Sequence, residues 1–234
     1  MTLCISKNTP AYQRFYNKTI KRIIGFLLAI LLLFILIPLY FLIAVAIVIE
    51  SGFPIFYRAE RGGYLGKTFR IYKFRSMVQN ADQIGGGTTA LNDNRITKVG
   101  NFLRKTKLDE TAQLINIIKG EMCFVGPRPE LLRYTQQYSG DELAILKVRP
   151  GITDYSSLEF INLDEIVGSG NADEMYEKHV LKRKNELRIK YAREVSFATD
   201  ARLFIQTVIR TIVKARSVVI PKGAKHGNNN TKKL

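Results

Sequence analysis

The sequence predicts an α+β fold that is mainly helical, with an N-terminal re-entrant membrane hairpin and a small cytosolic domain. Three observations carry this prediction. An apolar run fills residues 23–49, two alternating stretches lie between residues 53 and 75, and apolar residues recur at helical spacing in residues 108–119 and 197–212. We therefore expect a short β element and amphipathic helices, some of them interfacial, behind the membrane hairpin.

The overall composition limits the classes of partner. The chain has 234 residues, of which 46% are hydrophobic, so a folded domain with an accessory segment is expected. Its 36 basic and 20 acidic residues give a formal charge of +16, which indicates an anionic partner such as nucleic acid, phospholipid or a phosphorylated substrate. Cys4 and Cys123 lie far apart, and their spacing indicates neither a disulfide framework nor a thiolate metal site.

The apolar run at residues 23–49 is long enough for a transmembrane helix. Pro38 lies near its middle, where a proline removes a backbone donor and predicts a break or a sharp kink. The halves would be about 22 and 18 Å long, each too short for a hydrocarbon core of about 30 Å. Basic residues flank both ends, which favours placing both in the cytoplasm. We expect a helix-break-helix hairpin in one leaflet, and a kinked single span is the alternative.

Two alternating stretches, residues 53–58 and 69–75, surround a glycine-bearing turn at residues 61–63 and are expected to form strands. The second stretch carries Lys73 and Arg75, which either form a solvated face or bind an anion. Residues 83–89 form a glycine-rich loop without the spacing of a phosphate-binding P-loop. After a turn signal, residues 96–104 are expected to form a short helix or an extended segment.

A carboxylate pair stands at the start of the next predicted helix. Apolar residues at helical spacing predict a helix over residues 108–119, ended by Gly120, with Asp109 and Glu110 in its first turn. The helix dipole and free backbone N–H groups there keep a carboxylate ionised and favour an approaching anion. Helix capping is the alternative explanation for these acids.

An arginine held between two prolines follows, in the segment Val125-Gly126-Pro127-Arg128-Pro129. The prolines fix the backbone on both sides of Arg128, and Gly126 permits a close backbone approach. A guanidinium oriented in this way suits bidentate recognition of a phosphate.

Six motifs in this order make the chain resemble the bacterial sugar transferases, and among them the monotopic polyprenyl-phosphate phosphoglycosyl transferases. The motifs are Tyr72-Lys73-Phe74-Arg75-Ser76-Met77, Arg95-Ile96-Thr97-Lys98-Val99-Gly100, Leu108-Asp109-Glu110, Lys119-Gly120-Glu121-Met122, Val125-Gly126-Pro127-Arg128-Pro129-Glu130 and Arg149-Pro150-Gly151-Ile152-Thr153. The resemblance covers residues 18–215 and is to the minimal single-module form. It implies a re-entrant helix broken at a proline, usually within Ser-Pro and here within Ile37-Pro38.

The resemblance also implies a two-step reaction. Asp109 would attack the sugar-bearing phosphate of a UDP-sugar and expel UMP, and polyprenyl phosphate would then take the phosphosugar from Asp109. Glu110 would be the ligand of Mg²⁺. Arg128 and Pro127 belong to the loop that holds phosphate, and Lys73 and Arg75 are expected as further substrate contacts.

This sequence departs from the family pattern around the carboxylate pair. Lys107 stands where the family commonly has a serine that would cap the helix, with Thr106 as a substitute cap. Residues 155–167 fall where the family varies between substrate classes and are expected to read the sugar or the uridine. The second acidic pair in that segment, Asp164-Glu165, is expected to be exposed helix acid.

The C-terminal part is strongly basic. Apolar residues between Phe197 and Ile212 fall on one helical face, which suits a helix on an anionic membrane surface or ordinary packing against the domain. We therefore divide the chain into a cytosolic segment (residues 1–22), the membrane hairpin (residues 23–49), a catalytic domain (residues 50–216) and a basic tail expected to be disordered (residues 217–234).

Three functional classes follow from these patterns. The leading expectation is a phosphoglycosyl transferase on the cytoplasmic face of the bacterial inner membrane, with UDP-sugar, polyprenyl phosphate and the anionic bilayer as partners, and with a homodimer as a candidate assembly. It would perform the first membrane step of a capsule, exopolysaccharide, O-antigen or glycoprotein glycan pathway. The alternative is a membrane-anchored scaffold that binds anionic lipid or pathway partners. No nucleic-acid module accompanies the charge, so nucleic acid is not an expected partner.

Overall fold

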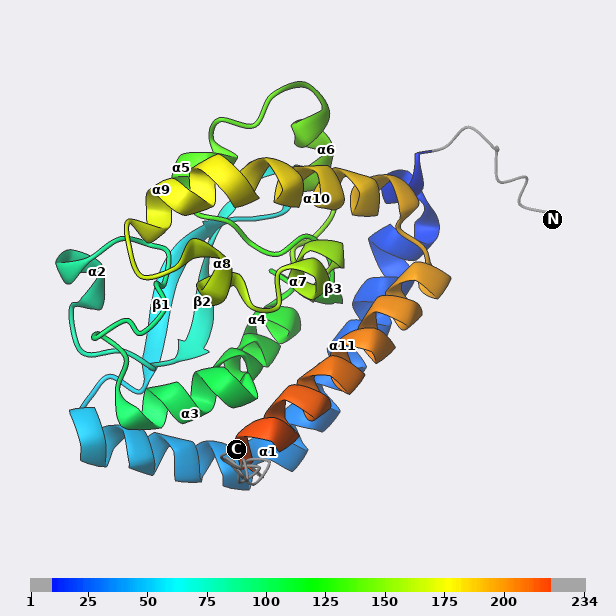
Figure 1. Ribbon diagram of the computed structural model, residues 1–234. Coiled ribbons are helices and arrows are strands. Elements are labelled where there is room, and N and C mark those ends of the chain that lie inside the picture. Colours follow the sequence, from blue (N-terminus) through cyan, green and yellow to red (C-terminus); the bar gives the residue numbers. More distant parts are fainter. Residues whose placement is uncertain (1–9, 220–234) are drawn as a thin grey trace, which may run out of the picture.

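The computed structural model describes residues 10–219, and these are mainly helical with four short strands (Figure 1). The α-helices are α1 (Lys21–Ser51), α2 (Ala81–Ile84), α3 (Lys98–Thr106), α4 (Leu114–Lys119), α5 (Leu132–Thr135), α6 (Leu143–Leu146), α7 (Tyr155–Glu159), α8 (Leu163–Val167), α9 (Ala172–Tyr176), α10 (Lys182–Glu194) and α11 (Phe197–Val219). Short 3₁₀ or π segments are η1 (Ala11–Gln13), η2 (Tyr16–Ile20), η3 (Tyr64–Gly66), η4 (Leu108–Gln113), η5 (Gly140–Glu142) and η6 (Glu177–Leu181).

The strands form two separate pairs. Strands β1 (Phe56–Gly62) and β2 (Thr68–Phe74) are antiparallel, with Phe56 opposite Phe74 and Gly62 opposite Thr68. Strands β3 (Cys123–Val125) and β4 (Gly151–Thr153) are parallel. The expected short β element is therefore present. The first strand starts at Phe56 and not at residue 53, because Pro54 has no N–H to donate to a ladder.

Helix α1 contains the apolar run and is continuous through Pro38, so the predicted break is wrong for the backbone hydrogen-bond pattern. Figure 1 shows instead a marked change of direction near the middle of the helix. A proline removes one hydrogen bond and crowds the preceding turn, and the neighbouring turns keep theirs. The helical segment Tyr16–Ser51 contains an 18-residue window with a mean hydropathy of 3.1, and it is the one helix among the described residues that is long and apolar enough to span a membrane.

The membrane helix is fastened to the domain along its length. Near its start, Arg22 donates to the carbonyls of Ile117 and Ile118 at the end of α4. Near its middle, the Tyr40 hydroxyl donates to the Thr111 carbonyl in η4 at 2.8 Å. Near its end, the Glu50 carboxylate accepts the first N–H groups of α3, at 2.7 and 2.9 Å. The bent α1 therefore braces α3, η4 and α4, which are consecutive in the chain.

A buried ion pair joins the start of α1 to α11. Lys21 Nζ lies 3.0 Å from Asp200 Oδ2, and these side chains are 6% and 9% exposed. The same carboxylate accepts hydrogen bonds from the hydroxyls of Tyr16 and Tyr191, each at 2.6 Å. One carboxylate therefore ties together η2, α1, α10 and α11.

We expect Asp200→Asn to lower the free energy of unfolding by about 3 kcal/mol, because it leaves the buried Lys21 ammonium without its counter-charge. The double variant Lys21→Met/Asp200→Asn should recover more than half of that loss, since it removes the stranded charge and keeps an acceptor for the tyrosines. Denaturation in one detergent measures both values. A single variant as stable as the wild-type protein would contradict this account of the pair.

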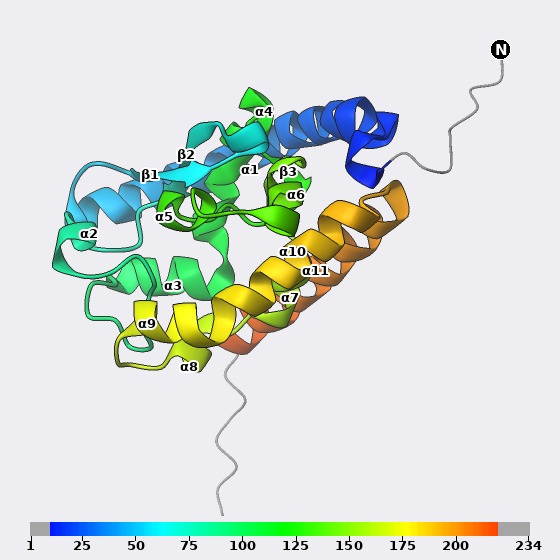
Figure 2. The same ribbon diagram turned by 90° about the horizontal axis from the view of Figure 1, so that it is seen from above.

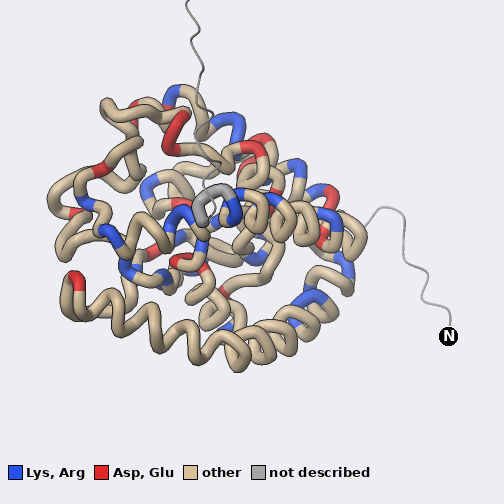
Figure 3. The backbone as a smooth tube through the Cα atoms, turned by 60° about the horizontal axis from the view of Figure 1, so that its bottom comes forward, with Lys and Arg blue, Asp and Glu red and all other residues tan. Residues whose placement is uncertain are grey.

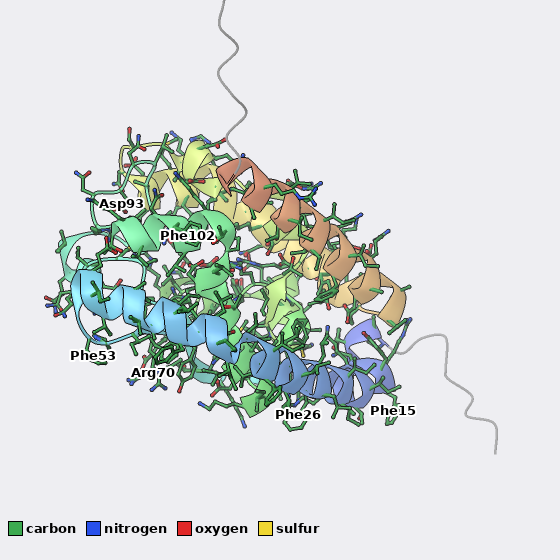
Figure 4. All side chains as sticks on the ribbon, turned by 90° about the horizontal axis from the view of Figure 1, so that it is seen from below. Phe15, Phe26, Phe53, Arg70, Asp93 and Phe102 are labelled. Atoms are coloured by element: carbon green, nitrogen blue, oxygen red, sulfur yellow. The ribbon has the colours of Figure 1, made fainter. Side chains whose placement is uncertain are left out.

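Large apolar side chains are exposed along one face formed by α1, α3 and α11, which Figure 4 shows from below. Phe102 of α3 is 49% exposed between the two longer helices. Figure 3 shows that α1 carries no charged residue along most of its length. The exposed large apolar residues of α11 are Phe197, Ile205, Val208, Ile209, Ile212 and Val213. Most of the predicted apolar face is therefore exposed, although Phe197 contacts Tyr16 with ring centroids 6.2 Å apart and Phe204 packs on Phe124 with ring centroids 5.7 Å apart.

The predicted disordered tail overlaps the end of α11, which continues helically to Val219. The rest of that predicted tail, and Cys4 near the other end, lie outside the described residues.

Candidate active site

The acidic pair lies where two helical segments meet. Helix α3 ends at Thr106, Lys107 adopts a left-handed conformation with φ of 61°, and Asp109 and Glu110 follow in the 3₁₀-helix η4. The helix predicted over residues 108–119 is thus η4 followed by α4, and it ends at Gly120 as expected. The Thr106 hydroxyl donates backward to the Phe102 carbonyl at 2.8 Å, so Thr106 is not the predicted cap.

Glu110 is clamped by two cations. The Arg128 guanidinium donates to both carboxylate oxygens, with Nη1 2.8 Å from Oε2, and Lys73 Nζ lies 3.2 Å from Oε1. Burial alone would raise the pKa of the Glu110 carboxyl, but the charges of Arg128 and Lys73 hold that pKa well below its usual range. Glu110 is therefore ionised and forms the centre of this cluster.

Asp109 has the opposite environment. Its side chain is 4% exposed, and Oδ1 has no hydrogen-bond partner among the described residues. Burial, followed by the charge of Glu110, raises the pKa of the Asp109 carboxyl. The helix start was expected to favour the ionised carboxylate, whereas the loss of water on burial has the largest effect on its pKa and acts in the opposite direction. The two neighbouring acids thus differ sharply in proton affinity.

The loop that carries Arg128 is held by close backbone contacts. A Cβ on Gly126 would lie 2.4 Å from the Arg149 carbonyl oxygen, so the predicted close approach is confirmed. Across the same contact, Gly126 N–H donates to the Thr153 carbonyl at 2.8 Å. The Arg128 side chain also donates to the Ile152 carbonyl at 3.0 Å. The parallel pairing of β3 with β4 therefore positions the guanidinium.

Asp154 supports the same loop, and the sequence analysis did not single it out. Its carboxylate accepts from the Arg128 backbone N–H at 3.2 Å and from the Ser157 N–H at 2.7 Å, where it caps α7. The local signal was an aspartate before a helix with two serines, which is typical of an N-cap. Its contact with the arginine loop depends on tertiary packing alone.

Two predicted substrate contacts lie elsewhere. Arg75 is buried and donates to the Ser51 carbonyl at 2.9 Å and to the Gly52 carbonyl, so it caps the end of α1. It follows β2 at the point where the chain passes that helix end, and this takes its side chain away from Glu110. Pro127 is buried and its carbonyl accepts from Gly151 N–H at 3.1 Å. Pro127 therefore shapes the arginine loop and does not face the large cavity described next.

A cavity of about 960 Å³ opens beside this cluster. Glu110, Lys73 and Arg128 lie in its wall, whereas the buried Asp109 is not among the lining residues. The cavity wall contains ten Lys or Arg and five Asp or Glu residues, so it suits an anionic ligand. The wall includes most of the segment predicted to read the sugar or uridine, and its Asp164-Glu165 pair is exposed as expected.

Within residues 10–219, no group of three or more His, Cys, Asp or Glu side chains could hold a metal ion alone. Mg²⁺ is usually bound by one or two carboxylates together with substrate phosphates and water. Asp109, with its unpartnered Oδ1, and the adjacent Glu110 fit that donor set, provided that a diphosphate supplies the other oxygens.

An apolar helix that braces an acidic pair beside a basic cavity is typical of a membrane-anchored protein whose site suits an anionic ligand. The family model for bacterial sugar transferases matches residues 16–214, so the chain belongs to this family and the resemblance seen in the sequence is confirmed.

Curated relatives share this family assignment. The chain is 36% identical over 201 residues to a UDP-glucose:undecaprenyl-phosphate glucose-1-phosphate transferase of Escherichia coli (strain K12), which covers 84% of this chain and 41% of that protein. It is 37% identical over 142 residues to a UDP-N-acetylgalactosamine-undecaprenyl-phosphate N-acetylgalactosaminephosphotransferase of Aeromonas hydrophila, covering 59% and 34%. It is 32% identical over 191 residues to the uncharacterized sugar transferase EpsL of Bacillus subtilis (strain 168), covering 81% and 83%. The chain thus spans about two fifths or less of the first two relatives.

Proposed function

We propose that this protein transfers a phosphosugar from a UDP-sugar to polyprenyl phosphate, releases UMP, and so performs the first membrane step of a glycoconjugate pathway. The observation that carries the proposal is the acidic pair beside a basic cavity, with Glu110 held by Arg128 and Lys73. Two relatives are named as transferases of glucose 1-phosphate or N-acetylgalactosamine phosphate with undecaprenyl phosphate, which supports this reaction class.

In the first step, an oxygen of Asp109 attacks the phosphorus that carries the sugar. The bond from this phosphorus to the oxygen of UMP breaks, and its electron pair leaves with UMP. In the second step, an oxygen of polyprenyl phosphate attacks the same phosphorus, and the Asp109 carboxylate is released. The charges of Lys73, Arg104 and Lys107 favour the ionised nucleophile and oppose the effect of its burial.

The cations around Glu110 would reduce the electrostatic repulsion between the Asp109 carboxylate and the diphosphate of the UDP-sugar. A diphosphate that enters the cavity competes with Glu110 for the Arg128 fork, and Lys73 lies beside the same carboxylate. Binding of substrate would therefore loosen η4 and turn Asp109 toward the cavity. When bound, Mg²⁺ would neutralise diphosphate charge, with Glu110 as its first protein ligand.

We place the domain on the cytoplasmic face of the bacterial inner membrane, with α1 as a re-entrant hairpin. The change of direction near the middle of α1 (Figure 1) and the basic residues at both ends support this topology. The exposed apolar faces of α3 and α11 would then lie at the bilayer surface with α1. This arrangement would keep the acidic pair at the depth of a lipid phosphate.

Cysteine labelling tests the topology. In a chain with Cys4→Ser and Cys123→Ala, single cysteines at Phe15→Cys and Lys67→Cys are expected to react only from the cytoplasmic side, because both positions are exposed in the domain. Labelling of intact and opened cells with a membrane-impermeant maleimide measures this. Reaction of the two cysteines from opposite sides would make α1 a span.

A panel of radiolabelled UDP-sugars with undecaprenyl phosphate and Mg²⁺ tests the reaction. UDP-glucose and UDP-N-acetylgalactosamine come first, because these donor sugars occur in the names of the relatives. We expect UMP release coupled to a lipid-linked labelled product. Folded protein that releases no UMP with any of the sugars would favour the scaffold interpretation.

The candidate homodimer stays a prediction. Light scattering in detergent can measure the mass of the assembly.

A further inference from the structure

Helix α10 contributes a second pair of cations to the cavity wall. Lys184 and Arg188 are 7% and 1% exposed, and both line the cavity. Arg188 Nη2 lies 2.9 Å from Glu130 Oε2, and the same oxygen accepts from the Tyr176 hydroxyl. Glu130 is therefore already paired.

Lys184 differs from its neighbour because no carboxylate pairs with it within residues 10–219. Its ammonium lies 4.8 Å from the ring centroid of Tyr176 and 5.8 Å from that of Phe160. Arg188 is thus paired with Glu130, whereas Lys184 has no carboxylate partner among the described residues, and an unpaired buried charge is costly. An anion in the cavity would remove that imbalance.

The protonation of Lys184 agrees with this interpretation. Burial, followed by the charge of Arg188, lowers the pKa of Lys184 to about 7, against the opposing effect of Glu130. Of the smaller effects, the charge of Arg128 also lowers the pKa of Lys184, and the charge of Asp154 raises it. A bound phosphate would favour the ammonium form, so binding would take up a proton near neutral pH.

The position of α10 indicates whether the phosphate bound by Lys184 belongs to the lipid or to the nucleotide. Figures 1 and 2 show α10 on the side of the domain away from the second half of α1. A lipid phosphate stays at the membrane surface, whereas a soluble nucleotide can reach α10. The half-buried ring of Phe160 also lines the cavity beside Lys184 and offers a stacking surface for a base.

We infer that Lys184 binds the phosphate that leaves with the nucleotide, while Arg128 and Lys73 hold the phosphate that stays with the sugar. This inference rests on the proposed transferase function. The P–O bond between the two phosphates breaks, the electron pair goes to the UMP oxygen, and Lys184 donates a hydrogen bond to UMP without transferring its proton. Lys184 would therefore serve the first half-reaction and not the second.

The test compares Lys184→Met with Lys182→Met, which removes an exposed lysine from the same helix. UMP affinity, measured by calorimetry at fixed Mg²⁺ in full-length protein, is expected to fall about 10- to 100-fold in Lys184→Met. Proton uptake on UMP binding near pH 7 should disappear with it. Lys182→Met should behave as the wild-type protein.

The two half-reactions provide an independent measurement. In Lys184→Met, formation of the covalent adduct should slow about 10-fold or more, while transfer from a preformed adduct to polyprenyl phosphate stays within about twofold. Unchanged UMP affinity in the folded variant would overturn the inference, as would a selective loss of the second half-reaction. Lys184→Gln provides the same comparison if the methionine variant does not fold. Failure of the transferase proposal is distinguishable, because the wild-type protein would then form neither adduct nor UMP.

Discussion

Replacing Asp109 by asparagine is expected to abolish the covalent phosphosugar adduct and to reduce turnover by roughly 10⁴-fold or more. The asparagine amide has nearly the same shape as the carboxylate but cannot displace UMP from phosphorus. Intact-protein mass spectrometry after incubation with a UDP-sugar detects the adduct, and release of labelled UMP measures turnover. Wild-type protein should gain the mass of one phosphosugar, and Asp109→Asn should gain none.

The same variant should fold at least as well as the wild-type protein. Burial and the neighbouring Glu110 raise the pKa of Asp109, so the ionised carboxylate opposes folding at pH values above its unfolded pKa of about 4. A neutral amide removes that penalty. Asp141→Asn, an exposed acid paired with Arg193, serves as the matched control and should keep full activity. Substantial turnover in Asp109→Asn would remove Asp109 from the role of nucleophile.

Replacing Arg128 by methionine is expected to reduce turnover by roughly 10²- to 10³-fold, because the cavity loses its bidentate phosphate donor. The variant also leaves the Glu110 carboxylate with Lys73 as its one remaining cation. The side chains of Arg128 and Glu110 are 27% and 12% exposed, so solvent screens this ion pair in part. We expect the loss of the pair to lower the free energy of unfolding by about 2 kcal/mol at pH 7. Arg128→Lys should be intermediate, since a single ammonium cannot bridge both oxygens.

The stability difference between wild-type protein and Arg128→Met should depend on pH. Since the folded-state pKa of Glu110 is lowered, its contribution is present above the unfolded value of about 4 and is lost as the pH falls through the folded value. Thermal denaturation from pH 7 to pH 3 should therefore show the two curves converging in acid. Arg193→Met, which breaks an exposed pair, should match the wild-type protein throughout. A gap that stays constant down to pH 3 would mean that Glu110 is not the partner that matters.

Much of the fold could be predicted from local patterns. The apolar run predicted α1, because the hydropathy of a long segment depends only on its composition. Gly120 ends α4 as predicted, because its φ of 85° is favourable for glycine. The sequence predicted a break at Pro38, whereas the helix continues through this residue and changes direction near its middle (Figure 1). The helix is continuous through Pro38 because the neighbouring turns keep their hydrogen bonds, and just after it the Tyr40 hydroxyl donates to the Thr111 carbonyl of the domain.

The candidate site was predicted in part. The acidic pair and the arginine between prolines were visible as short motifs, and the structure brings Glu110, Arg128 and Lys73 together. Arg75 was grouped with Lys73 because a strand pattern shows which residues alternate and not where the strand ends. The chain leaves β2 before Arg75, and the side chain caps α1 instead.

By itself, the sequence determined the apolar helix, the adjacency of Asp109 and Glu110, and the rigid frame of Arg128, because each depends on residues close together in the chain. Only the tertiary structure decided that Asp109 is buried with a raised pKa, while the pKa of Glu110 is held well below its usual range. The difference in pKa depends on the exclusion of water and on two cations, Arg128 and Lys73, which lie 18 and 37 residues from Glu110 in the chain. No local sequence pattern contains these contacts. The membrane helix contributes to the same outcome, since its contacts with α3, η4 and α4 hold the acidic pair in place.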